Sequence, residues 1–351
     1  MNKADQNLCE RVLSPGQEIG RLKLVPIKRN GALLLALPLK RSLAIETLNL
    51  YQPQKIRGRI LRALLRGIVK CGLLKLSPQV EFKLGSQGLF SGLNDLNSGS
   101  ELGFLLSGGD SQYRNLIGLC EVDGAKMVVK SGSDEAKDIL IREYELQCKL
   151  AEEISGVPAC KAYFKIDKGV AYLTEYVYGR SPKGSSGDAI ALGLLNEWLS
   201  AGQLKSVNTL PDWTALKQSL SDDEMSYFAA LGDLELISPA VHGDYAPWNM
   251  KIDSDGLIKV LDWEYSYQTG MPGWDWLHYN VQRLKLVDMQ CADLIIAHCR
   301  RMMSHSVFAD YLSKAGLNGN EEALLGSYLF YTGRYHSYPR EEEIKIWLST
   351  K

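Results

Sequence analysis

One stretch of the sequence constrains the fold of this chain more than any other. It spans positions 241 to 264 and reads VHGDYAPWNMKIDSDGLIKVLDWE. Asp253–Gly256 has the composition of a tight turn, and the residues after it alternate in polarity, so we expect a β-hairpin. Asn249 precedes the hairpin and Asp262 ends it, and residues that flank a hairpin lie at the same end of its ladder.

The register of this hairpin predicts which side chains meet. Pairing Ile252 with Leu257 across a four-residue turn places Asn249 close to Asp262, with Asp244 on the loop just before them. Two carboxylates and an amide oxygen then converge at one strand end. Oxygen ligands of this kind suit Mg²⁺, which completes its coordination shell with phosphates and water.

Phosphoryl transfer needs such a set of groups. Metal ions bridge the phosphates, while a carboxylate orients the attacking hydroxyl group and accepts its proton. The protein kinase catalytic loop H-R-D-x-x-x-x-N separates its aspartate and asparagine by five positions, as Asp244 and Asn249 are separated here. Alone, these residues would be interpreted as turn aspartates and a capping asparagine. The spacing of the whole set, together with Asp262, favours a catalytic role for these residues.

The same stretch resembles a known family. His242–Asn249 is similar to the Brenner motif, and Leu261–Glu264 to the metal-binding aspartate segment, of the aminoglycoside phosphotransferase and choline kinase superfamily. The resemblance covers residues from about 104 to 300. It implies a protein-kinase-like two-lobe fold of the α+β class, here with an extra N-terminal region. It also implies a small-molecule kinase that uses ATP or GTP as co-substrate together with Mg²⁺.

The resemblance assigns roles to individual residues. It makes Asp244 the catalytic base, Asn249 and Asp262 the metal ligands, and His242 a catalytic residue that braces the loop. Gly243 stands where protein kinases have an arginine, and Asp-Trp-Glu replaces their Asp-Phe-Gly. These departures favour a small-molecule kinase over a protein kinase.

The nucleotide-binding half should lie upstream. Lys130 ends an apolar run and resembles the strand lysine that grips the α- and β-phosphates. Glu143 and Glu145 both lie in the following helical pattern, about 200° apart round a helix, so only one can face Lys130. The family pattern favours Glu143.

Two further segments would complete a nucleotide site. Glycines in a loop one hairpin before the lysine would let backbone N–H groups approach phosphate oxygens. A segment after the last strand of this region resembles the inter-lobe hinge, whose backbone would bind the adenine edge. The residues are Gly108, Gly109 and Ser111 in the loop, and Glu175, Tyr176 and Val177 in the hinge.

Three regions are predicted along the chain. Residues 1–98 form an N-terminal extension of unknown role, with strand-like runs at 21–27 and 32–39. Residues 99–178 form a nucleotide-binding lobe of strands with one helix, in which Asp123-Gly124 is a hairpin turn. Residues 179–351 form a mainly helical lobe, which carries the catalytic loop and the acceptor site. Helices are predicted there at 189–204, 213–236, 273–287 and 293–314.

Residues after the hairpin have plainer interpretations. The resemblance makes Asp275 a brace for the catalytic loop, and Trp274 and Trp276 are more typical of a core than of a substrate platform. The three histidines that follow are most simply structural or solvated, since no pair of them has metal-ligand spacing. They are His278, His298 and His305.

A basic helical pattern covers residues 54–76. Its cations form one stripe and its isoleucines and leucines another. Three interpretations stay open: the solvated face of a packed helix, a membrane-surface helix, and a cradle for an anionic substrate. The cationic stripe is Lys55, Arg59, Arg62, Arg66 and Lys70, and the apolar stripe is Ile56, Ile60, Leu64 and Ile68, widened by Leu61 and Leu65.

Composition narrows the class of protein. A net charge of −1 gives no global field that points to nucleic acid. Seven scattered cysteines are typical of reduced thiols in a cytoplasmic protein, with peripheral membrane contact left open.

The phosphate acceptor could be a sugar or glycan intermediate, an amino alcohol or an aminoglycoside. The motif variant HGDYAPWN resembles family members that act on a sugar or glycan. An acidic run, Asp222–Glu224, could meet a cationic acceptor. A pseudokinase without catalysis and a membrane-associated scaffold are the competing functions.

Overall fold

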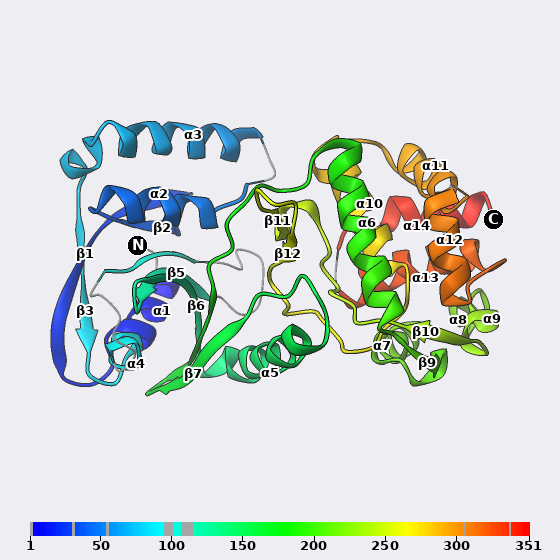
Figure 1. Cartoon of the computed structure of the whole chain (residues 1–351), viewed down its shortest axis with the longest axis horizontal. Coiled ribbons are helices and arrows are strands. Elements are labelled where there is room, and N and C mark those ends of the chain that lie inside the picture. The colour runs from blue at the N-terminus through cyan, green and yellow to red at the C-terminus, as the bar shows by residue number, and fades with distance from the viewer. Residues whose placement is uncertain are drawn as a thin grey trace. The chain divides into compact units, whose positions relative to one another are not determined.

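The structure is a computed structural model, and it describes residues 3–29, 32–53, 56–94, 101–106, 115–304, 306–336 and 338–351. The chain forms two compact units (Figure 1). Unit 1 comprises Met1–Cys148 and Pro158–Val177, and unit 2 comprises Lys149–Val157 and Tyr178–Lys351. Unit 1 is built on a sheet and unit 2 is mainly helical, which confirms the predicted α+β class.

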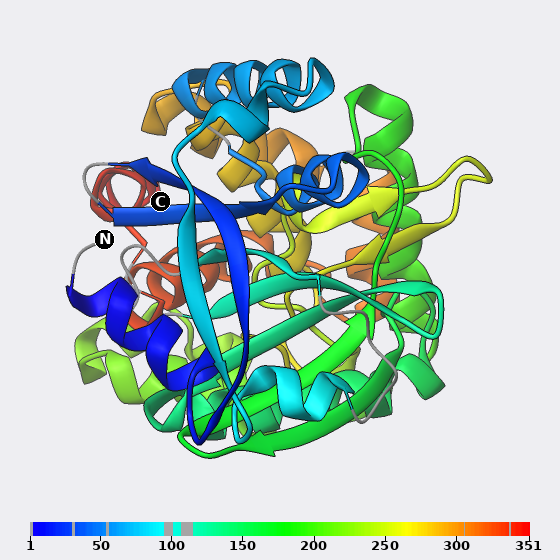
Figure 2. The ribbon, with the colours of Figure 1, turned by 90° about the vertical axis from the view of Figure 1, so that its left-hand side faces the viewer.

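The described part of unit 1 contains an eight-stranded sheet in the order β3-β1-β2-β4-β5-β6-β8-β7. Neighbouring strands pair antiparallel throughout this order. Figure 2 shows how strongly the sheet twists between its two edges. The strands are β1 (Glu18–Arg29), β2 (Ala32–Pro38), β3 (Val80–Gly85), β4 (Gly103–Leu106), β5 (Leu116–Val122), β6 (Ala125–Ser133), β7 (Cys160–Ile166) and β8 (Gly169–Glu175).

Helices cover both faces of this sheet because successive strand residues point to opposite faces. On β4, Phe104 and Leu106 pack into one core, whereas Leu105 packs into the other. The first core includes α1 and α4, and the second includes α2 and α3. These helices are α1 (Lys3–Leu13), α2 (Arg41–Leu50), α3 (Ile56–Lys70) and α4 (Leu89–Asn94), and α5 (Lys137–Glu153) packs against β8.

The N-terminal region does not form a separate packing unit, which differs from the predicted extension. Strand β2 pairs with β4 through Leu35 opposite Leu105 and Ala36 opposite Phe104, so β1, β2 and β3 continue the same sheet. Of the turn-rich boundary at 94–100, all but Asn94 lies outside the described residues. The edge strand of a sheet can pair with any strand of suitable shape. The local sequence of β2 therefore does not predict which strand it pairs with.

The hairpin between β5 and β6 forms as predicted. Its two turn residues, Asp123 and Gly124, have positive φ values of 51° and 76°. Val122 pairs with Ala125 directly across them. Positive φ at both central positions is the backbone of a type I′ turn, which matches the twist of the strands.

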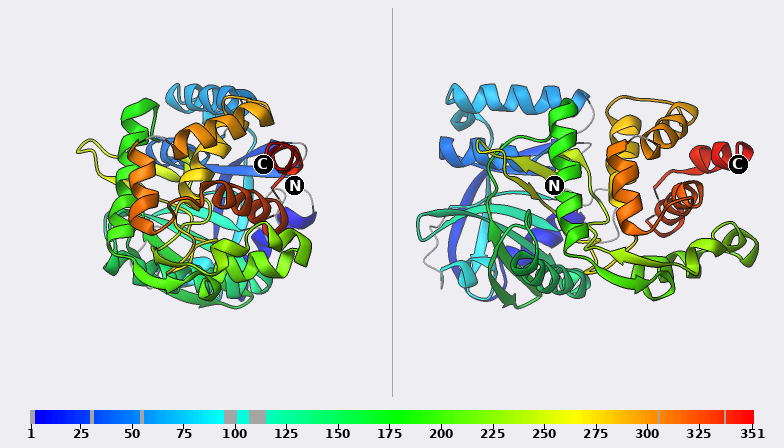
Figure 3. Two further views of the ribbon diagram at one scale, coloured as in Figure 1. Left: turned by 90° about the vertical axis from the view of Figure 1, so that its right-hand side faces the viewer. Right: turned by 45° about the vertical axis from the view of Figure 1, so that its right-hand side comes forward.

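Figure 3 shows the helices of unit 2 from two further sides. Two of the predicted helices are interrupted: the 213–236 segment forms three short helices and a strand, and the 293–314 segment forms two helices. A capping box at Ser221 and Glu224 starts a new helix inside the first segment. The helices are α6 (Gly184–Ser200), α7 (Pro211–Ser219), α8 (Asp222–Ser226), α9 (Ala229–Gly232), α10 (Trp274–Leu286), α11 (Ala292–Met303), α12 (Ser306–Ala315), α13 (Glu321–Phe330) and α14 (Glu341–Ser349).

Two small sheets complete unit 2. Strand β9 (Gln203–Ser206) pairs with β10 (Glu235–Ser238), and β11 (Met250–Ile252) pairs with β12 (Ile258–Val260). A π-helical turn, Tyr331–Tyr335, follows α13. None of the helices in the described ranges is both long and apolar enough to cross a membrane. All seven cysteines are free thiols.

Candidate active site

The catalytic-loop candidate begins where Val241 forms an isolated β-bridge with Tyr267. The next residue but one, Gly243, has a φ of +80°. A Cβ atom there would lie 2.5 Å from the carbonyl oxygen of Tyr265. Both the backbone conformation and the crowding therefore require glycine, which explains why the arginine of protein kinases is absent from this position.

Asp275 holds the loop from the first turn of α10. Its two carboxylate oxygens accept hydrogen bonds from the backbone N–H groups of His242, at 2.7 Å, and Gly243, at 2.9 Å. Asp275 is buried, and burial raises its pKa to about 7, against the lowering effect of these two bonds. The bracing contact predicted for Asp275 is thus present.

His242 ties the loop to the end of the hairpin. Its Nε2 atom lies 2.9 Å from the carbonyl oxygen of Leu261, and its Nδ1 accepts the backbone N–H of Asp244. Trp263 packs edge-on against the imidazole, with ring centroids 4.9 Å apart. Burial lowers the pKa of His242, so the ring is neutral and can donate at one nitrogen while it accepts at the other.

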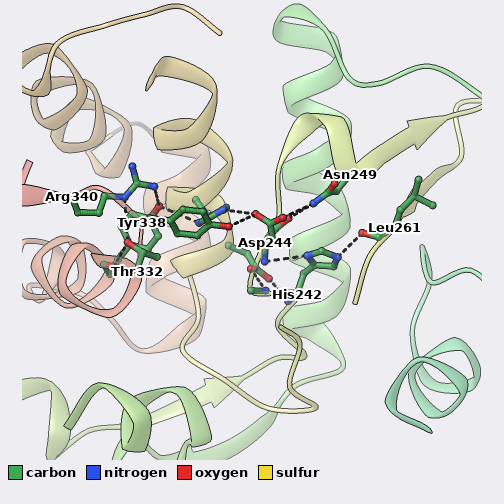
Figure 4. Close-up of polar contacts among 11 residues, drawn as sticks. His242, Asp244, Asn249, Leu261, Thr332, Tyr338 and Arg340 are labelled. Atoms are coloured by element: carbon green, nitrogen blue, oxygen red, sulfur yellow. Dashed lines mark hydrogen bonds and ion pairs between the residues drawn. The ribbon is translucent and has the colours of Figure 1, made fainter. Parts of the chain in front are cut away.

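The carboxylate of Asp244 lies among protein donors (Figure 4). Asn249 donates to its Oδ2 over 2.8 Å, Tyr338 donates to its Oδ1 over 3.2 Å, and His278 lies 2.8 Å from the same Oδ1. Burial raises the pKa of Asp244, but the hydrogen bond from His278 and the smaller effects of His242 and Asn249 outweigh it. The pKa of Asp244 is therefore below its ordinary value, and the group is a carboxylate at neutral pH.

His278 belongs to this site, contrary to the prediction that it is only structural or solvated. It lies on α10 one helical turn after Asp275, so the same helix face presents both residues to the loop. That spacing of three was the signal in the sequence. Burial lowers the pKa of His278 more than its contact with Asp244 raises it, so the imidazole is neutral.

A chain of hydrogen bonds continues behind His278. Arg340 donates to the hydroxyl group of Tyr328 over 3.4 Å, and that hydroxyl group lies 3.3 Å from Nδ1 of His278. Because a carboxylate can only accept, we assign the His278 proton to Nε2 and leave Nδ1 to accept from Tyr328. Arg340 also contacts Thr332 in the π-helical turn, which fixes its guanidinium group. None of these three supporting residues was identified from the sequence.

The hairpin after the loop forms one residue out of the predicted register. Ile252 pairs with Ile258 rather than with Leu257, so the turn is longer by one residue. Asp253 explains the difference, because its Oδ1 accepts the backbone N–H groups of both Asp255 and Leu257. A side chain that caps its own loop in this way competes with the tighter turn.

The new register places the two metal-ligand candidates next to each other. The backbone carbonyl oxygen of Asn249 accepts the backbone N–H of Leu261 at 2.6 Å, and Asp262 is the next residue. Asp262 is exposed and has a φ of 69°, which is unusual for a residue with a side chain. A backbone strained in this way is often found at functional sites.

The donor set fits a hard cation such as Mg²⁺. Asn249 directs its amide nitrogen at Asp244, through bonds to the backbone oxygen and to Oδ2, so its Oδ1 lies on the opposite side of the amide group. That oxygen and the exposed carboxylate of Asp262 are the ligand type that Mg²⁺ prefers. Within the described ranges, there is no group of three or more His, Cys, Asp or Glu side chains that could hold a metal ion.

Unit 1 contains the predicted lysine–glutamate pair. Lys130 on β6 contacts both carboxylate oxygens of Glu143 on α5, at 2.8 and 2.7 Å, and both side chains are buried. Glu145 is exposed, so the choice between the two glutamates is settled. A buried ion pair costs desolvation free energy, which makes it weak evidence for stability and a reason to consider a functional role.

The hinge candidates lie where the chain leaves unit 1. Glu175 ends β8, and its backbone N–H bonds to the carbonyl oxygen of Ala159. Tyr176 donates from its hydroxyl group to Glu46 of α2 over 2.6 Å, which ties the N-terminal region to this segment. Val177 is the last residue of unit 1. The candidate phosphate loop, with Gly108, Gly109 and Ser111, lies outside the described residues, as does His305.

Two other candidate groups are structural. The acidic run Asp222–Glu224 forms the first turn of α8 behind a capping box, and Glu224 also pairs with Arg334 at 2.7 Å. Trp274 and Trp276 are both buried, as predicted for core residues. The acidic run therefore serves the start of a helix.

Solved structures are the known proteins to which this chain shows similarity. No protein-family model and no curated protein matches it. Among solved structures it is similar to aminoglycoside phosphotransferase APH(4)-Ia, with 10% identity, coverage of 74% of this chain and 94% of that chain, and a TM-score of 0.48. It is also similar to a protein assigned as a fructosamine-3-kinase from Haemophilus somnus, with 14% identity, coverage of 71% and 90%, and a TM-score of 0.46.

These solved structures are of the kind that the sequence resembles. A third, an aminoglycoside phosphotransferase from Streptomyces rimosus solved with ADP and streptomycin, is 14% identical, covers 61% of this chain and 88% of that chain, and has a TM-score of 0.41. All three TM-scores lie below 0.5. The fold of this chain is therefore argued from its own strands, helices and pairings.

Proposed function

We propose that this chain is a small-molecule phosphotransferase, which moves the γ-phosphoryl group of ATP or GTP onto a hydroxyl group of its acceptor. The observation that carries the proposal is the arrangement around Asp244: an ionised carboxylate on a braced loop, with Asn249 and Asp262 adjacent at the hairpin end. The buried Lys130–Glu143 pair supports it, since phosphotransferases of this type hold the nucleotide phosphates with such a lysine.

The contacts of Asp244 suit a residue that orients an acceptor hydroxyl group. A carboxylate has about four acceptor positions, and donors within the described residues fill three of them. About one position is then left for the hydroxyl group of an acceptor, and the side chain is partly exposed. The three donors fix the plane of the carboxylate, which sets the direction of the attacking oxygen.

The same donors set the strength of the base. They hold the pKa of Asp244 below its ordinary value, so it is ionised and ready to accept a proton at neutral pH. A weak base of this kind takes the proton late, as the hydroxyl oxygen bonds to phosphorus and becomes acidic. Orientation is therefore the larger part of its role, in line with phosphoryl transfer in general.

Asn249 and Asp262 would hold Mg²⁺, which would neutralise charge on the phosphates when bound. His242 and Asp275 act on the loop that presents Asp244, and they are positioning residues. Lys130 would contact the α- and β-phosphates, with Glu143 fixing its position. Backbone groups of Glu175–Val177 would bind the adenine edge, and the loop with Gly108, Gly109 and Ser111 would cover the phosphates.

For the acceptor we propose a sugar or a glycan intermediate. The HGDYAPWN variant of the catalytic loop supports this choice, and Glu224 of the acidic run Asp222–Glu224 is already engaged by a capping box and by Arg334. Nucleotide consumption with panels of sugars, amino alcohols and aminoglycosides tests this directly. Turnover with a sugar alone supports the proposal, and turnover confined to a cationic acceptor contradicts the substrate class. Nucleotide binding without turnover on any panel would favour a pseudokinase.

A further inference from the structure

Helix α3 has two apolar faces, and only one of them is buried. Leu65 and Val69 pack into the core that α3 shares with α2, and Leu61 is partly buried beside them. Figures 1 and 2 show α2 lying between α3 and the sheet. This inner face accounts for the attachment of α3 to unit 1.

The outer face carries a row of aliphatic side chains that the core does not use. They recur every four residues and so lie within an arc of about 120°. A 3-10 turn after the helix, Leu73–Leu76, adds two more exposed leucines, Leu73 and Leu76. The exposed fractions along α3 are 73% for Ile56, 55% for Ile60, 62% for Leu64 and 36% for Ile68.

Cations flank this row on one side. Arg59, Arg66 and Lys70 are exposed and lie within about 40° of one another round the helix. Arg57 and Lys75 are also exposed. The sequence has no acidic residue between Glu46 and Glu81. The outer face is therefore both apolar and strongly cationic, without internal neutralisation.

One predicted member of the cationic stripe behaves differently. Arg62 turns inward and donates to the carbonyl oxygen of Tyr51 over 3.0 Å. Its burial lowers its pKa, with a smaller effect from Arg66. Arg62 is therefore part of the attachment of α3, and a test of the outer face should leave it unchanged.

We propose that the outer face of α3 and its following turn dock onto the surface of an anionic phospholipid bilayer. The aliphatic row would enter the boundary between headgroups and acyl chains, with the helix lying in the plane of the surface. The long arginine and lysine side chains would reach back to the lipid phosphates. This surface is independent of the residues assigned to phosphoryl transfer.

The chemistry of the face favours lipid over other anionic partners. A surface for single-stranded nucleic acid would use cations with aromatic side chains between them, and residues 52–81 contain no aromatic residue. Phosphate groups alone would also give no reason for six exposed aliphatic side chains on α3 and the turn that follows it. A bilayer surface uses both features at once, because it presents anionic phosphates directly above an apolar layer.

Sedimentation of the full chain with vesicles tests the proposal. We expect binding to phosphatidylcholine vesicles that contain phosphatidylglycerol, weaker binding at high salt, and little binding to phosphatidylcholine alone. Changing Arg59, Arg66 and Lys70 together to glutamine should weaken binding roughly fivefold per charge, or about a hundredfold in all. A matched control removes three exposed cations of unit 2, Arg301→Gln, Lys314→Gln and Lys345→Gln, and should bind as the wild type does.

The apolar row needs its own test. Ile60→Ser with Leu64→Ser changes two exposed side chains, so the fold should be retained while vesicle binding falls about tenfold or more. Equal losses in the control and in the outer-face variant would mean that net charge alone drives binding, which overturns the proposal. So would failure of the wild type to bind anionic vesicles, or binding to single-stranded nucleic acid or an acidic protein with no binding to vesicles.

A native cysteine reports whether α3 itself meets the membrane. Cys71 and Cys291 are the two exposed cysteines, and Cys71 directly follows α3. In a Cys291→Ser background, a polarity-sensitive fluorophore on Cys71 should shift to the blue on anionic vesicles. The same fluorophore on Cys291, in a Cys71→Ser background, should not shift. The reverse result would place the contact elsewhere and reject α3.

Discussion

His278 and Asp244 are thirty-four residues apart in the chain, and Nε2 of His278 lies 2.8 Å from Oδ1 of Asp244. The histidine is neutral and almost completely buried, and its other nitrogen is held by Tyr328. It can therefore act only as a donor to the carboxylate. That contact makes the properties of Asp244 depend on a residue in a different element, α10, which also supplies the loop brace Asp275.

We predict that His278 sets the pH at which activity falls on the acid side. His278→Phe removes a hydrogen bond to a charged group, so the pKa of Asp244 should rise by about one unit or more. The acid limb of the kcat/KM profile, measured with a confirmed acceptor, should move to higher pH by the same amount. His278→Gln keeps a donor and should move it less.

A purely structural role for His278 gives a different result. Both variants would then lower the midpoint of thermal unfolding without moving the acid limb. Tyr338→Phe provides a second comparison, because it removes the longer of the two donors to Oδ1, at 3.2 Å, and its shift should be smaller.

A second prediction concerns the metal. Asp262→Asn is a better probe than alanine, because asparagine tolerates the positive φ of 69° at this position and keeps the side-chain volume. It replaces a carboxylate ligand of Mg²⁺ by an amide. Calorimetry should show that Mg²⁺ no longer strengthens nucleotide binding, while binding without Mg²⁺ is nearly unchanged. Equal Mg²⁺ dependence in both proteins would remove Asp262 from the ligand set.

A third prediction separates stability from nucleotide binding at the ion pair in unit 1. Lys130→Met leaves Glu143 buried without its lysine and should destabilise the fold by about 3–5 kcal/mol. Changing Glu143→Gln as well removes the uncompensated charge, so most of that stability should return. Nucleotide affinity should stay low in both variants, because the phosphate-binding lysine is absent from each. Recovery of affinity in the double variant would show that the pair is only structural.

Sequence reasoning identified the parts of the site whose partners lie at fixed local distances. The spacing of Asp244 and Asn249, and the hairpin that follows them, are local patterns. Lys130 and Glu143 were paired through the family pattern, and their contact is present. His278 was missed because nothing local to a histidine says which loop its helix will pack against. The interval of three from Asp275 would have placed it on the same helix face.

The rest was missed for reasons of packing. Tyr338 reaches Asp244 from a segment near the C-terminus, and such a contact depends on how α13 and its π-helical turn are packed. The one-residue error in the hairpin register came from Asp253, whose side chain bonds two backbone N–H groups of its own loop. In α3, periodicity found the apolar residues and did not divide them into a buried and an exposed face. The packing of α3 against α2 determines which of these residues are buried.

A fourth prediction follows from the burial of Asp275. Its pKa rises from 3.8 in the ordinary state to about 7 in the folded chain. Between these values the unfolded chain is stabilised by ionisation and the folded chain is not, so this group lowers stability as pH rises from about 4 to about 7. Asp275→Asn does not ionise. Unfolding in urea across this range should therefore show that the stability of the wild type falls relative to that of the variant as pH rises.

Asp275→Asn also loses a hydrogen-bond acceptor, and the resulting loss of stability serves as the control. Asparagine has one acceptor oxygen for the two backbone N–H groups of His242 and Gly243, so this contact alone should make the variant less stable by about 1–3 kcal/mol. That constant part does not depend on pH, and the slope of the difference isolates the titration. A difference that is constant from pH 4 to 7 would mean that the two backbone donors keep Asp275 ionised throughout.

The last prediction concerns the base itself. In Asp244→Asn the new amide must place its NH₂ group either toward Asn249, which is a donor, or toward His278 and Tyr338, which are also donors. Either orientation sets a donor against a donor. The orientation toward His278 is the less costly, since the imidazole can move its proton to Nδ1 and the Tyr328 hydroxyl group can turn to accept it. The loop should thus keep its shape without a base.

Activity should then fall while nucleotide binding is retained. Loss of a general base lowers kcat by roughly 10²–10⁴-fold. Nucleotide affinity should barely change, because the proposed phosphate contacts, Lys130 and the Mg²⁺ ligands, are intact. Lys130→Ala should instead raise the KM for nucleotide as well as lower kcat. Near-full turnover by Asp244→Asn on a confirmed acceptor would show that another group takes the proton and that Asp244 serves only to orient the acceptor.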